Sequence, residues 1–378
     1  MNIIWFTKLT DKDSFRNTQV MISEALRKQG NEVTLILARH FTDKKEHQDG
    51  VLYLPTVNVR LLSGLVYGFI ISLYLPSLLK NKKVDIIMVS GDTIWSPFLL
   101  FFKIFQVPLI LDLRSLPIDT DTVLLKDISL YLSRYVTDGL TTISPELADI
   151  LKKRYHLQDK RIGTWSSGFS KAQFTMPEEN MIKNRFADTF VLLHHGTYSP
   201  TRGIEELIRS IAEVDDPLKM KMKLLLVGIP ENKIEELTKL CTELNLNEQV
   251  EIIPPVDIKK IPLYIQACDI GIIPLPPNNE SWRVSVPLKT LEYLAMGKPI
   301  IATKIPFHQK IFDLATCGIL LETNTPKEIA NGIMLLYQNK EKLNEMGKHG
   351  KEMVDTYYSW ERKASELEAF LKTIVVST

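Results

Sequence analysis

The pattern that most constrains the fold is an alternation of short apolar runs, rich in β-branched residues, with longer stretches of helical spacing. Residues 3–6 form the first such run, residues 21–26 carry apolar side chains on one helical face, and residues 33–37 return to a strand pattern after Gly30. A strand, a crossover helix and a second strand make a βαβ unit, which requires a parallel sheet. We therefore predict an α/β chain.

Two series of this alternation follow each other along the 378 residues, and the polar stretch at residues 166–188 separates them. Further strands are expected at residues 86–89, 109–113, 140–143 and 162–165, and then at 190–194, 223–227, 250–253, 270–273, 299–302 and 319–321. We predict two doubly wound domains, residues 1–170 and 171–357, because a chain of this length supports two hydrophobic cores. A final helix at residues 358–378 is apolar on one face and should pack back toward the N-terminal domain.

Charge and cysteine content indicate which classes of partner and which cellular compartment to expect. The net charge of +1 and the lack of a Lys/Arg-rich run give no reason to expect a nucleic-acid partner. Cys241, Cys268 and Cys317 are odd in number and far apart, which favours buried thiols in a reducing compartment over disulfides or a zinc site. The N-terminus lacks the features of a signal peptide, so we expect a cytoplasmic protein.

Residues 61–79 form an uncharged stretch close to the length of about 20 residues that a membrane-spanning helix needs. Glycine, serine and Pro76 dilute its hydrophobicity, so we expect a buried helix or one that touches a membrane, with a true span as the alternative. Residues 98–105 are apolar enough to rest on a membrane face as well. Peripheral contact with the inner face of the cytoplasmic membrane would explain both stretches, and burial as core helices is the alternative for both.

The segment at residues 285–301 carries the most chemical information. Ser285 and Pro287 are expected to start a helix whose free backbone N–H groups and positive dipole end form an anion site. Lys289 in the first turn is unfavourable for the helix itself, which suggests that an anion such as phosphate compensates it. Glu292, one turn deeper, can accept hydrogen bonds from the paired hydroxyls of a ribose. The alternative is a helix that only packs, with both charges solvated.

A second segment, residues 194–203, follows the first strand of the second domain. Gly196 would let the backbone approach a diphosphate closely, and Arg202 would bind it as a bidentate cation. A glycine and an arginine are common in ordinary turns, so this loop gains weight only from its agreement with the first segment.

The 285–301 segment closely resembles the donor-binding signature of retaining GT-B glycosyltransferases of the group 1 or family 4 type. In these enzymes a helix ending in a Glu-Tyr-Met-Ala-x-Gly-Lys-Pro-like run binds the nucleotide sugar. The 194–203 loop resembles the family's Gly-Arg-x-x-x-x-Lys-Gly loop, and weaker likeness extends from residue 2 to 360. The resemblance implies two Rossmann-like domains facing a cleft, with the acceptor on the N-terminal domain and the donor on the C-terminal one.

The resemblance also implies a reaction and its residues. It predicts transfer of a sugar, with retention of anomeric configuration, from a nucleotide-diphosphate donor to a saccharide or lipid-linked acceptor. The expected process is cell-surface polysaccharide or glycoconjugate synthesis. Catalytic roles fall to Arg202, Lys289 and Arg114. Donor binding falls to Gly196, Thr197, Arg202, Arg283, Ser285, Lys289 and Glu292. No cofactor or metal is expected, because helix dipoles and basic side chains replace the ion in this fold.

Several positions depart from the family pattern. Val284 replaces the first carboxylate of the Glu-x7-Glu motif, so contact with the donor sugar is left to Asn279, Glu280 or backbone N–H groups. Thr197 stands where the family usually has arginine. Arg114 stands where many members have His-Asp; it can bind a phosphate or a hydroxyl, or form a structural ion pair, but it is not a general base. Residues 7–12 replace a glycine-rich loop.

Rival functions remain at this stage. A sugar-nucleotide epimerase can use the same architecture without an acceptor, and a non-catalytic nucleotide-sugar binder would fit the loss of the glutamate at Val284. A nicotinamide dehydrogenase is not favoured, because no G-x-G-x-x-G follows a strand. Asp119 and Asp121 form an Asp-x-Asp pair that could hold a divalent ion, which is the alternative to a metal-free site.

Overall fold

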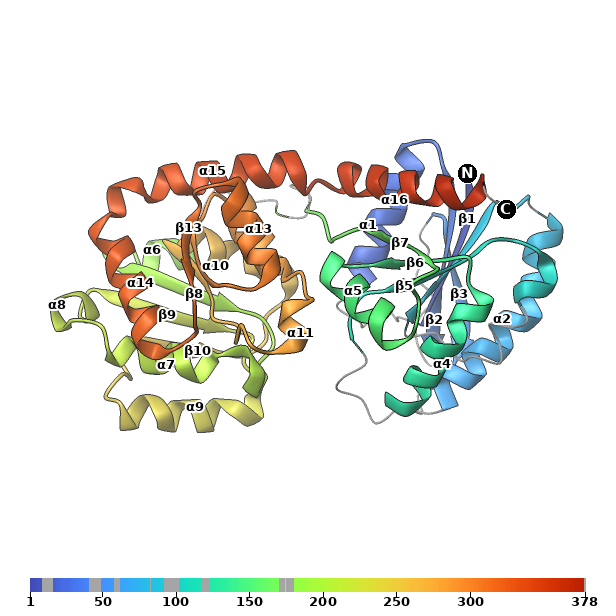
Figure 1. The fold of residues 1–378 in the computed structure, drawn as a ribbon. Helices are drawn as coiled ribbons and strands as arrows, with labels where there is room; N and C mark the ends of the chain where they lie inside the picture. The colour runs from blue at the N-terminus through green and yellow to red at the C-terminus, as the bar shows by residue number, and fades with distance from the viewer. Residues whose placement is uncertain are drawn as a thin grey trace. The chain divides into compact units, whose positions relative to one another are not determined.

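The computed structural model describes residues 1–8, 16–40, 49–57, 62–81, 83–91, 102–116, 123–169, 174 and 180–376. These residues form two compact units, shown in Figure 1. The N-terminal unit comprises Met1–Gly168 and Trp360–Thr378, and the C-terminal unit comprises Phe169–Ser359. The division thus lies close to the boundaries expected after residues 170 and 357, and the last helix belongs to the N-terminal unit.

The N-terminal unit is built on a seven-stranded parallel sheet in the order β3-β2-β1-β4-β5-β6-β7. Its strands are β1 (Asn2–Thr7), β2 (Glu32–His40), β3 (Val51–Thr56), β4 (Ile86–Ser90), β5 (Leu109–Leu113), β6 (Gly139–Thr142) and β7 (Arg161–Thr164). Its helices are α1 (Arg16–Lys28), α2 (Leu62–Asn81), η2 (Lys103–Phe105), α4 (Val123–Val136), α5 (Pro145–Arg154) and α16 (Trp360–Val375). Every residue of β4 and β5 is buried, as expected of central parallel strands covered on both faces.

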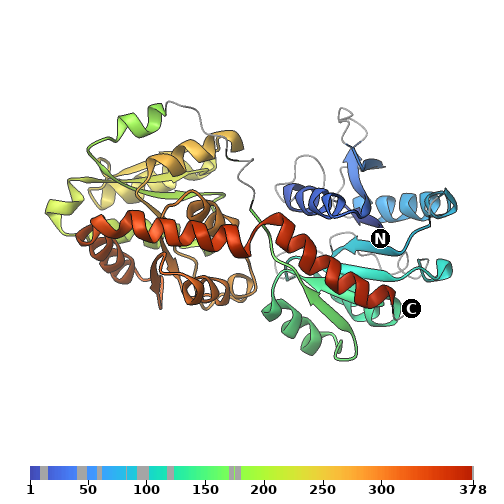
Figure 2. The same ribbon diagram turned by 90° about the horizontal axis from the view of Figure 1, so that it is seen from above.

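A local capping signal places α5, and packing on the N-terminal sheet places α16. Ser144 caps α5 by accepting a hydrogen bond from the Leu147 backbone N–H at 3.2 Å, and Pro145 occupies the first turn as predicted. The C-terminal α16 lies over the N-terminal sheet, as Figure 2 shows, and packs on α1 and β7. Its Leu367 and Leu371 are fully buried there, which confirms that the last helix packs back on the first domain.

The C-terminal unit has a six-stranded parallel sheet in the order β10-β9-β8-β11-β12-β13. Its strands are β8 (Phe190–His195), β9 (Met222–Val227), β10 (Val250–Ile253), β11 (Ile270–Ile273), β12 (Ile300–Thr303) and β13 (Gly318–Leu321). Its longer helices are α7 (Ile204–Ala212), α9 (Glu231–Glu243), α10 (Ile261–Ala267), α12 (Leu288–Ala295), α13 (Pro306–Leu314), α14 (Pro326–Gln338) and α15 (Leu343–Tyr357), joined by the short α6 (Met181–Arg185), η4 (Pro200–Arg202), α8 (Asp216–Lys219), η5 (Ile258–Lys260), α11 (Glu280–Arg283) and η6 (Lys340–Lys342). The predicted pair of doubly wound parallel sheets is confirmed.

The uncharged stretch at residues 61–79 forms most of α2. One face of this helix packs inward through Tyr67, Ile71 and Leu75, and the Tyr67 hydroxyl donates to the backbone oxygens of Thr7 and Ile36 at 2.8 and 3.0 Å. A sheet-covering face is what a domain helix requires. Among the helices that the structure describes, none combines the length and the apolarity needed to cross a bilayer.

Candidate functional site

The candidate site lies where the central strand β8 of the C-terminal sheet ends. Strand β8 runs between β9 and β11, and its last two residues are His194 and His195. Gly196 follows immediately, and α12 brings Lys289 and Glu292 to the same place. The carboxyl ends of parallel strands are where open α/β sheets bind their ligands, so the position agrees with a binding site.

Lys289 is the central cation of this group. Its side chain is buried, with 8% exposed, and its ammonium Nζ lies 3.2 Å from His194 Nε2. Gly196 has a φ of +119°, and a Cβ atom there would lie 3.2 Å from Nζ of Lys289. The site therefore favours glycine at position 196 for two reasons: the backbone conformation is left-handed in φ, and a side chain would crowd the ammonium group.

The hydrogen bonds of His194 define its protonation. Its Nδ1 lies 2.9 Å from the backbone oxygen of Ile272, which can only accept, so Nδ1 carries the proton. Nε2 then has a free lone pair and accepts from Lys289. Burial, and next the charge of Lys289, hold the pKa of His194 well below its usual value, which keeps the ring neutral.

The charge of Lys289 is poorly compensated. Burial, reinforced by the nearby charge of Arg202 and opposed by Glu292, lowers the pKa of Lys289 to about 7. Burial also raises the pKa of Glu292, against the effect of Lys289. Two cations in a low-dielectric setting with a carboxylate that prefers to be neutral form a site that favours an added anion.

His195 also lies close to Glu292. Its Nε2 is 3.3 Å from Oε2 of Glu292, yet the pair lacks hydrogen-bond alignment, and Nε2 has no hydrogen-bond partner among the described residues. The ring packs edge-on to Tyr293 at 5.0 Å between centroids. Burial, with the charge of Lys289, lowers the pKa of His195 to about 3, so this contact joins a neutral imidazole to the carboxyl group.

Arg202 approaches from the loop after β8. It ends η4, next to Gly203, whose φ of +70° and 2.0 Å approach of an added Cβ to the Pro274 oxygen require glycine. The Arg202 guanidinium lies 5.0 Å from the Trp282 ring centre, and the Trp282 indole N–H donates to the Thr201 oxygen at 2.6 Å. Burial lowers the pKa of Arg202. The loop is therefore anchored on α11.

The remaining predicted donor residues lie around this group with fewer contacts. Ser285 precedes α12 and donates to the Trp282 oxygen at 2.9 Å, and the helix begins at Leu288, so the expected helix start at Ser285 was wrong. Pro287 is the N-cap residue of α12, and no side chain caps this end of the helix. Thr197 and Arg283 are exposed.

The positions considered for the donor sugar differ in kind. Val284 is a core residue, 2% exposed, so the missing glutamate is replaced by packing. Asn279 uses its side-chain oxygen to cap α11, accepting from Ser281 and Trp282 backbone N–H groups at 3.0 and 3.4 Å. Glu280 is exposed in the first turn of the same helix.

Arg114 lies in the N-terminal unit and is engaged within it. Its guanidinium stacks 3.7 Å above the Trp165 ring, donates to the Trp165 oxygen at 2.8 Å and to Ser167 Oγ at 3.3 Å. Burial, offset by Asp112, lowers its pKa to about 10. These contacts fit a structural role for Arg114. The alternative expected from the sequence was a structural ion pair, whereas the guanidinium here stacks on a ring and donates to Trp165 and Ser167. Its catalytic role stays a prediction.

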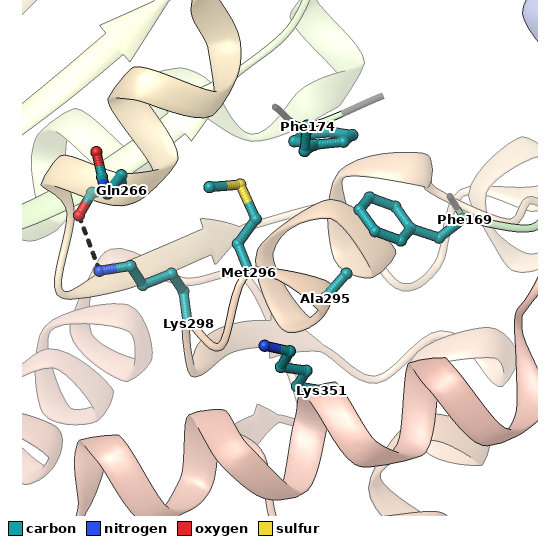
Figure 3. Close-up of a pocket in the computed structure, with 7 residues that line it drawn as sticks. All are labelled: Phe169, Phe174, Gln266, Ala295, Met296, Lys298 and Lys351. Atoms are coloured by element: carbon teal, nitrogen blue, oxygen red, sulfur yellow. Dashed lines mark hydrogen bonds between the residues drawn. The ribbon is translucent and has the colours of Figure 1, made fainter. Parts of the chain in front are cut away.

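A separate pocket of about 280 Å³ lies at the other end of α12 (Figure 3). Its lining is Phe169, Phe174, Gln266, Ala295, Met296, Lys298 and Lys351. The Lys298 ammonium donates to the backbone oxygens of Gln266 and Cys268 at 3.0 and 2.6 Å, so this cation holds the fold together. The pocket shares no residue with the Lys289 group. Among described residues no group of three potential ligands could hold a metal, and Asp119 and Asp121 lie outside them.

The geometry defines a class of protein: two α/β units with parallel sheets, of which the second has a buried lysine beside a glycine of positive φ at the carboxyl end of its central strand, a position suited to binding an anion. Family comparison then identifies the chain. Residues 18–172 match Glycosyltransferase Family 4, and residues 176–353 match Glycosyl transferases group 1. The chain therefore belongs to the glycosyltransferases that these two models describe together, one for each part of the chain.

Individual relatives are distant. A D-inositol 3-phosphate glycosyltransferase 1 of Catenulispora acidiphila is 26% identical over 216 residues, which cover 54% of this chain and 50% of that protein. The chain thus spans about half the length of the curated relatives it matches. Two solved structures share the fold. Sucrose-phosphate synthase from Thermosynechococcus elongatus has a TM-score of 0.77 and 16% identity, and the match covers both chains in full. HepE from Anabaena, in complex with UDP, has a TM-score of 0.73 and 17% identity, and the match covers 99% of this chain and 100% of that one.

The two histidines of β8 were missed from the sequence. A signal was present, since consecutive histidines at the end of an otherwise apolar strand are unusual among buried residues. Their roles depend, however, on the Ile272 oxygen of the neighbouring strand and on α12, both about 80 to 100 positions away in the chain.

Proposed function

We propose that the chain transfers a sugar from a nucleotide-diphosphate donor of the UDP or GDP type to a saccharide or lipid-linked acceptor. The observation that carries the proposal is the buried Lys289 ammonium beside Gly196, with the charge of Arg202 close enough to lower its pKa. Such a site costs stability when empty and gains most from a ligand with concentrated negative charge. A solved structure of the same fold, HepE, holds UDP.

In this proposal the C-terminal unit binds the donor. Lys289 and Arg202 contact the diphosphate, and Glu292 accepts hydrogen bonds from the ribose hydroxyls. As the bond between the sugar and the diphosphate breaks, negative charge grows on the leaving phosphate, where the two cations stabilise it. The N-terminal unit binds the acceptor. Retention of anomeric configuration, a hexosyl donor and use in cell-surface polysaccharide or glycoconjugate synthesis in the cytoplasm belong to the same proposal.

Donor turnover tests this directly. Purified chain is incubated with UDP- and GDP-sugars, with and without saccharide and lipid-linked acceptors, and release of nucleoside diphosphate is measured. We expect acceptor-dependent release that falls about 10²-fold in Lys289→Met, because a charged transition-state contact is lost. Lys239→Met, at an exposed lysine of α9 in the same unit, is the control.

The rival functions give other results. An epimerase interconverts the nucleotide sugar without acceptor, and a non-catalytic binder shows saturable donor binding without release of diphosphate. Either result, or equal rates in Lys289→Met and Lys239→Met, would refute the transferase proposal.

Membrane contact is the second part of the proposal, and α4 of the N-terminal unit supports it. The outward side chains of this helix are Ile128, Tyr131, Leu132 and Tyr135, between 37% and 56% exposed, whereas Ser129 and Ser133 face inward and are buried. These four apolar residues have the i, i+3, i+4, i+7 spacing of one helical face. The helix also buries Leu130 and Val136, so it is apolar on its inner and its outer side, whereas the outer side of an ordinary surface helix is polar.

Other exposed residues of the same unit have the same character. Helix α2 exposes Phe69, Leu73 and Tyr74, and η2 exposes Ile104. Cations accompany them: the Arg134 guanidinium lies 5.1 and 4.7 Å from the rings of Tyr131 and Tyr135. The carboxylate of α4, Asp127, is already paired with Arg154 and Tyr155. Aromatic and aliphatic side chains with flanking cations suit the surface of an anionic bilayer.

Vesicle flotation tests the membrane contact. We expect the protein to float with phosphatidylcholine vesicles containing about a third phosphatidylglycerol, and less with phosphatidylcholine alone. Ile128→Gln/Leu132→Gln should reduce binding roughly tenfold or more, because two exposed apolar side chains that would enter the bilayer are lost. Ile258→Gln/Leu335→Gln, at exposed positions of the C-terminal unit, is the matched control. Equal flotation of the two variants, or a dimer that only the first disrupts, would overturn this part.

A further inference from the structure

We propose that His194 is a positioning residue for the donor site: its Nε2 holds the Lys289 ammonium group in place beside Gly196 for the diphosphate. The inference rests on the proposed function and deepens it, because it concerns how the same site keeps its cation ready. His194 need not touch the ligand itself. It acts through Lys289.

The imidazole is fixed before any ligand arrives. His194 has no exposed surface, and its Nδ1 donates to the Ile272 oxygen of β11 at 2.9 Å. The remaining nitrogen, Nε2, therefore presents a lone pair at a defined point, 3.2 Å from Lys289 Nζ. A four-carbon lysine chain has many rotamers, and one hydrogen bond to a rigid acceptor removes much of that freedom in advance.

The choice of a neutral acceptor has a physical reason. A carboxylate at this point would hold the ammonium more strongly, but it would also neutralise the charge that the diphosphate needs. A neutral imidazole accepts one N–H hydrogen bond from the ammonium group and leaves the positive charge of that group uncompensated. Glu292, the carboxylate nearby, is driven toward its neutral form by burial and does not replace His194 in this role.

A purely structural role is the competing explanation. The bond from Nδ1 to Ile272 links β8 to β11, and it could be the only purpose of the residue. The two roles use different nitrogens, and side chains exist that imitate each one separately. Asparagine places its amide where Nδ1 stands, and can donate to Ile272. Glutamine places its amide oxygen near the Nε2 position, and can accept from Lys289. Methionine matches glutamine in length and offers no comparable acceptor.

The test compares His194→Gln, His194→Asn and His194→Met for binding of UDP and GDP by calorimetry, with thermal melting as the measure of folding. We expect His194→Gln to bind within about threefold of the wild type, and the other two to lose roughly ten- to a hundredfold, the range for a hydrogen bond to a charged group. A double-mutant cycle with Lys289→Met should show that the His194→Met loss disappears when the lysine is absent.

The outcomes separate the two levels of the proposal. Binding by His194→Asn at wild-type affinity, or equal losses in His194→Gln and His194→Met, would overturn the positioning role and leave the donor site standing. Failure of the wild type to bind either nucleotide would overturn both. If His194→Asn does not fold, the comparison of nucleotide binding by His194→Gln and His194→Met still tests the positioning role. These two side chains have similar length and differ in whether they offer a hydrogen-bond acceptor to Lys289.

Discussion

Donor binding should be coupled to proton uptake at Lys289. In the empty site the pKa of Lys289 is lowered to about 7, so at roughly pH 7.5 about a quarter of the molecules carry the ammonium proton. A bound diphosphate replaces the lost solvation and adds opposite charge, which returns the pKa toward its ordinary value. Binding should then take up about three-quarters of a proton per nucleotide at this pH.

The sign of the pH dependence follows from this. The complex retains a proton that the free protein has already lost above about pH 7, so affinity should fall as pH rises, approaching tenfold per pH unit until the pKa of the bound lysine is reached. Below about pH 6 this group is protonated in both states and contributes no dependence.

Calorimetry in buffers of different ionisation enthalpy measures the uptake. The ligand should be the nucleotide sugar that gives the largest thermal shift, because its diphosphate has no terminal group that titrates near neutrality, unlike a monoester phosphate with a pKa of about 6. Glu292→Gln serves as the control for protons exchanged at the carboxyl group. A heat of binding that is independent of the buffer, or an uptake unchanged in Lys289→Met, would refute the argument.

Three further predictions concern single side chains. Arg202→Ala should lower donor turnover about 10²-fold with little change in melting temperature, and unchanged turnover would remove it from the site. Gly196→Ala should weaken nucleotide binding at least tenfold, since its φ of +119° and the 3.2 Å distance from its Cβ to Lys289 Nζ both oppose a side chain; calorimetry would show it. Val284→Glu should lower the unfolding free energy by several kcal/mol in denaturant titration without raising activity, because the position is 2% exposed; a gain in turnover would contradict this.

The sequence was sufficient for most of the fold because the central strands are continuous apolar runs. β4, β5 and β8 could be recognised from that pattern, and the capping signal at Ser144 located α5. β3 was missed because it lies at the edge of the sheet, contains Pro55 and leaves Leu52 exposed, so its pattern is weak.

The candidate site was predictable only where a local motif carries it. The grouping of Lys289, Glu292, Gly196 and Arg202 follows from two segments that resemble a known signature, whereas the role of His194 depends on a carbonyl of the next strand. Arg114 could not be placed from sequence either, since its partner ring, Trp165, is brought near by the pairing of β5, β6 and β7. Contacts between distant segments are not encoded in periodicity.

The central claim is that the carboxyl end of β8 binds the diphosphate of a nucleotide sugar. A crystal structure of the full chain soaked with UDP-glucose, or with the GDP-sugar that shifts the melting temperature most, tests it most directly. We predict diphosphate oxygens within hydrogen-bond distance of Lys289 Nζ and the Arg202 guanidinium, with ribose hydroxyls on Glu292. Nucleotide bound instead in the pocket between Phe169 and Met296, with the Lys289 ammonium still held by His194 alone, would contradict the account.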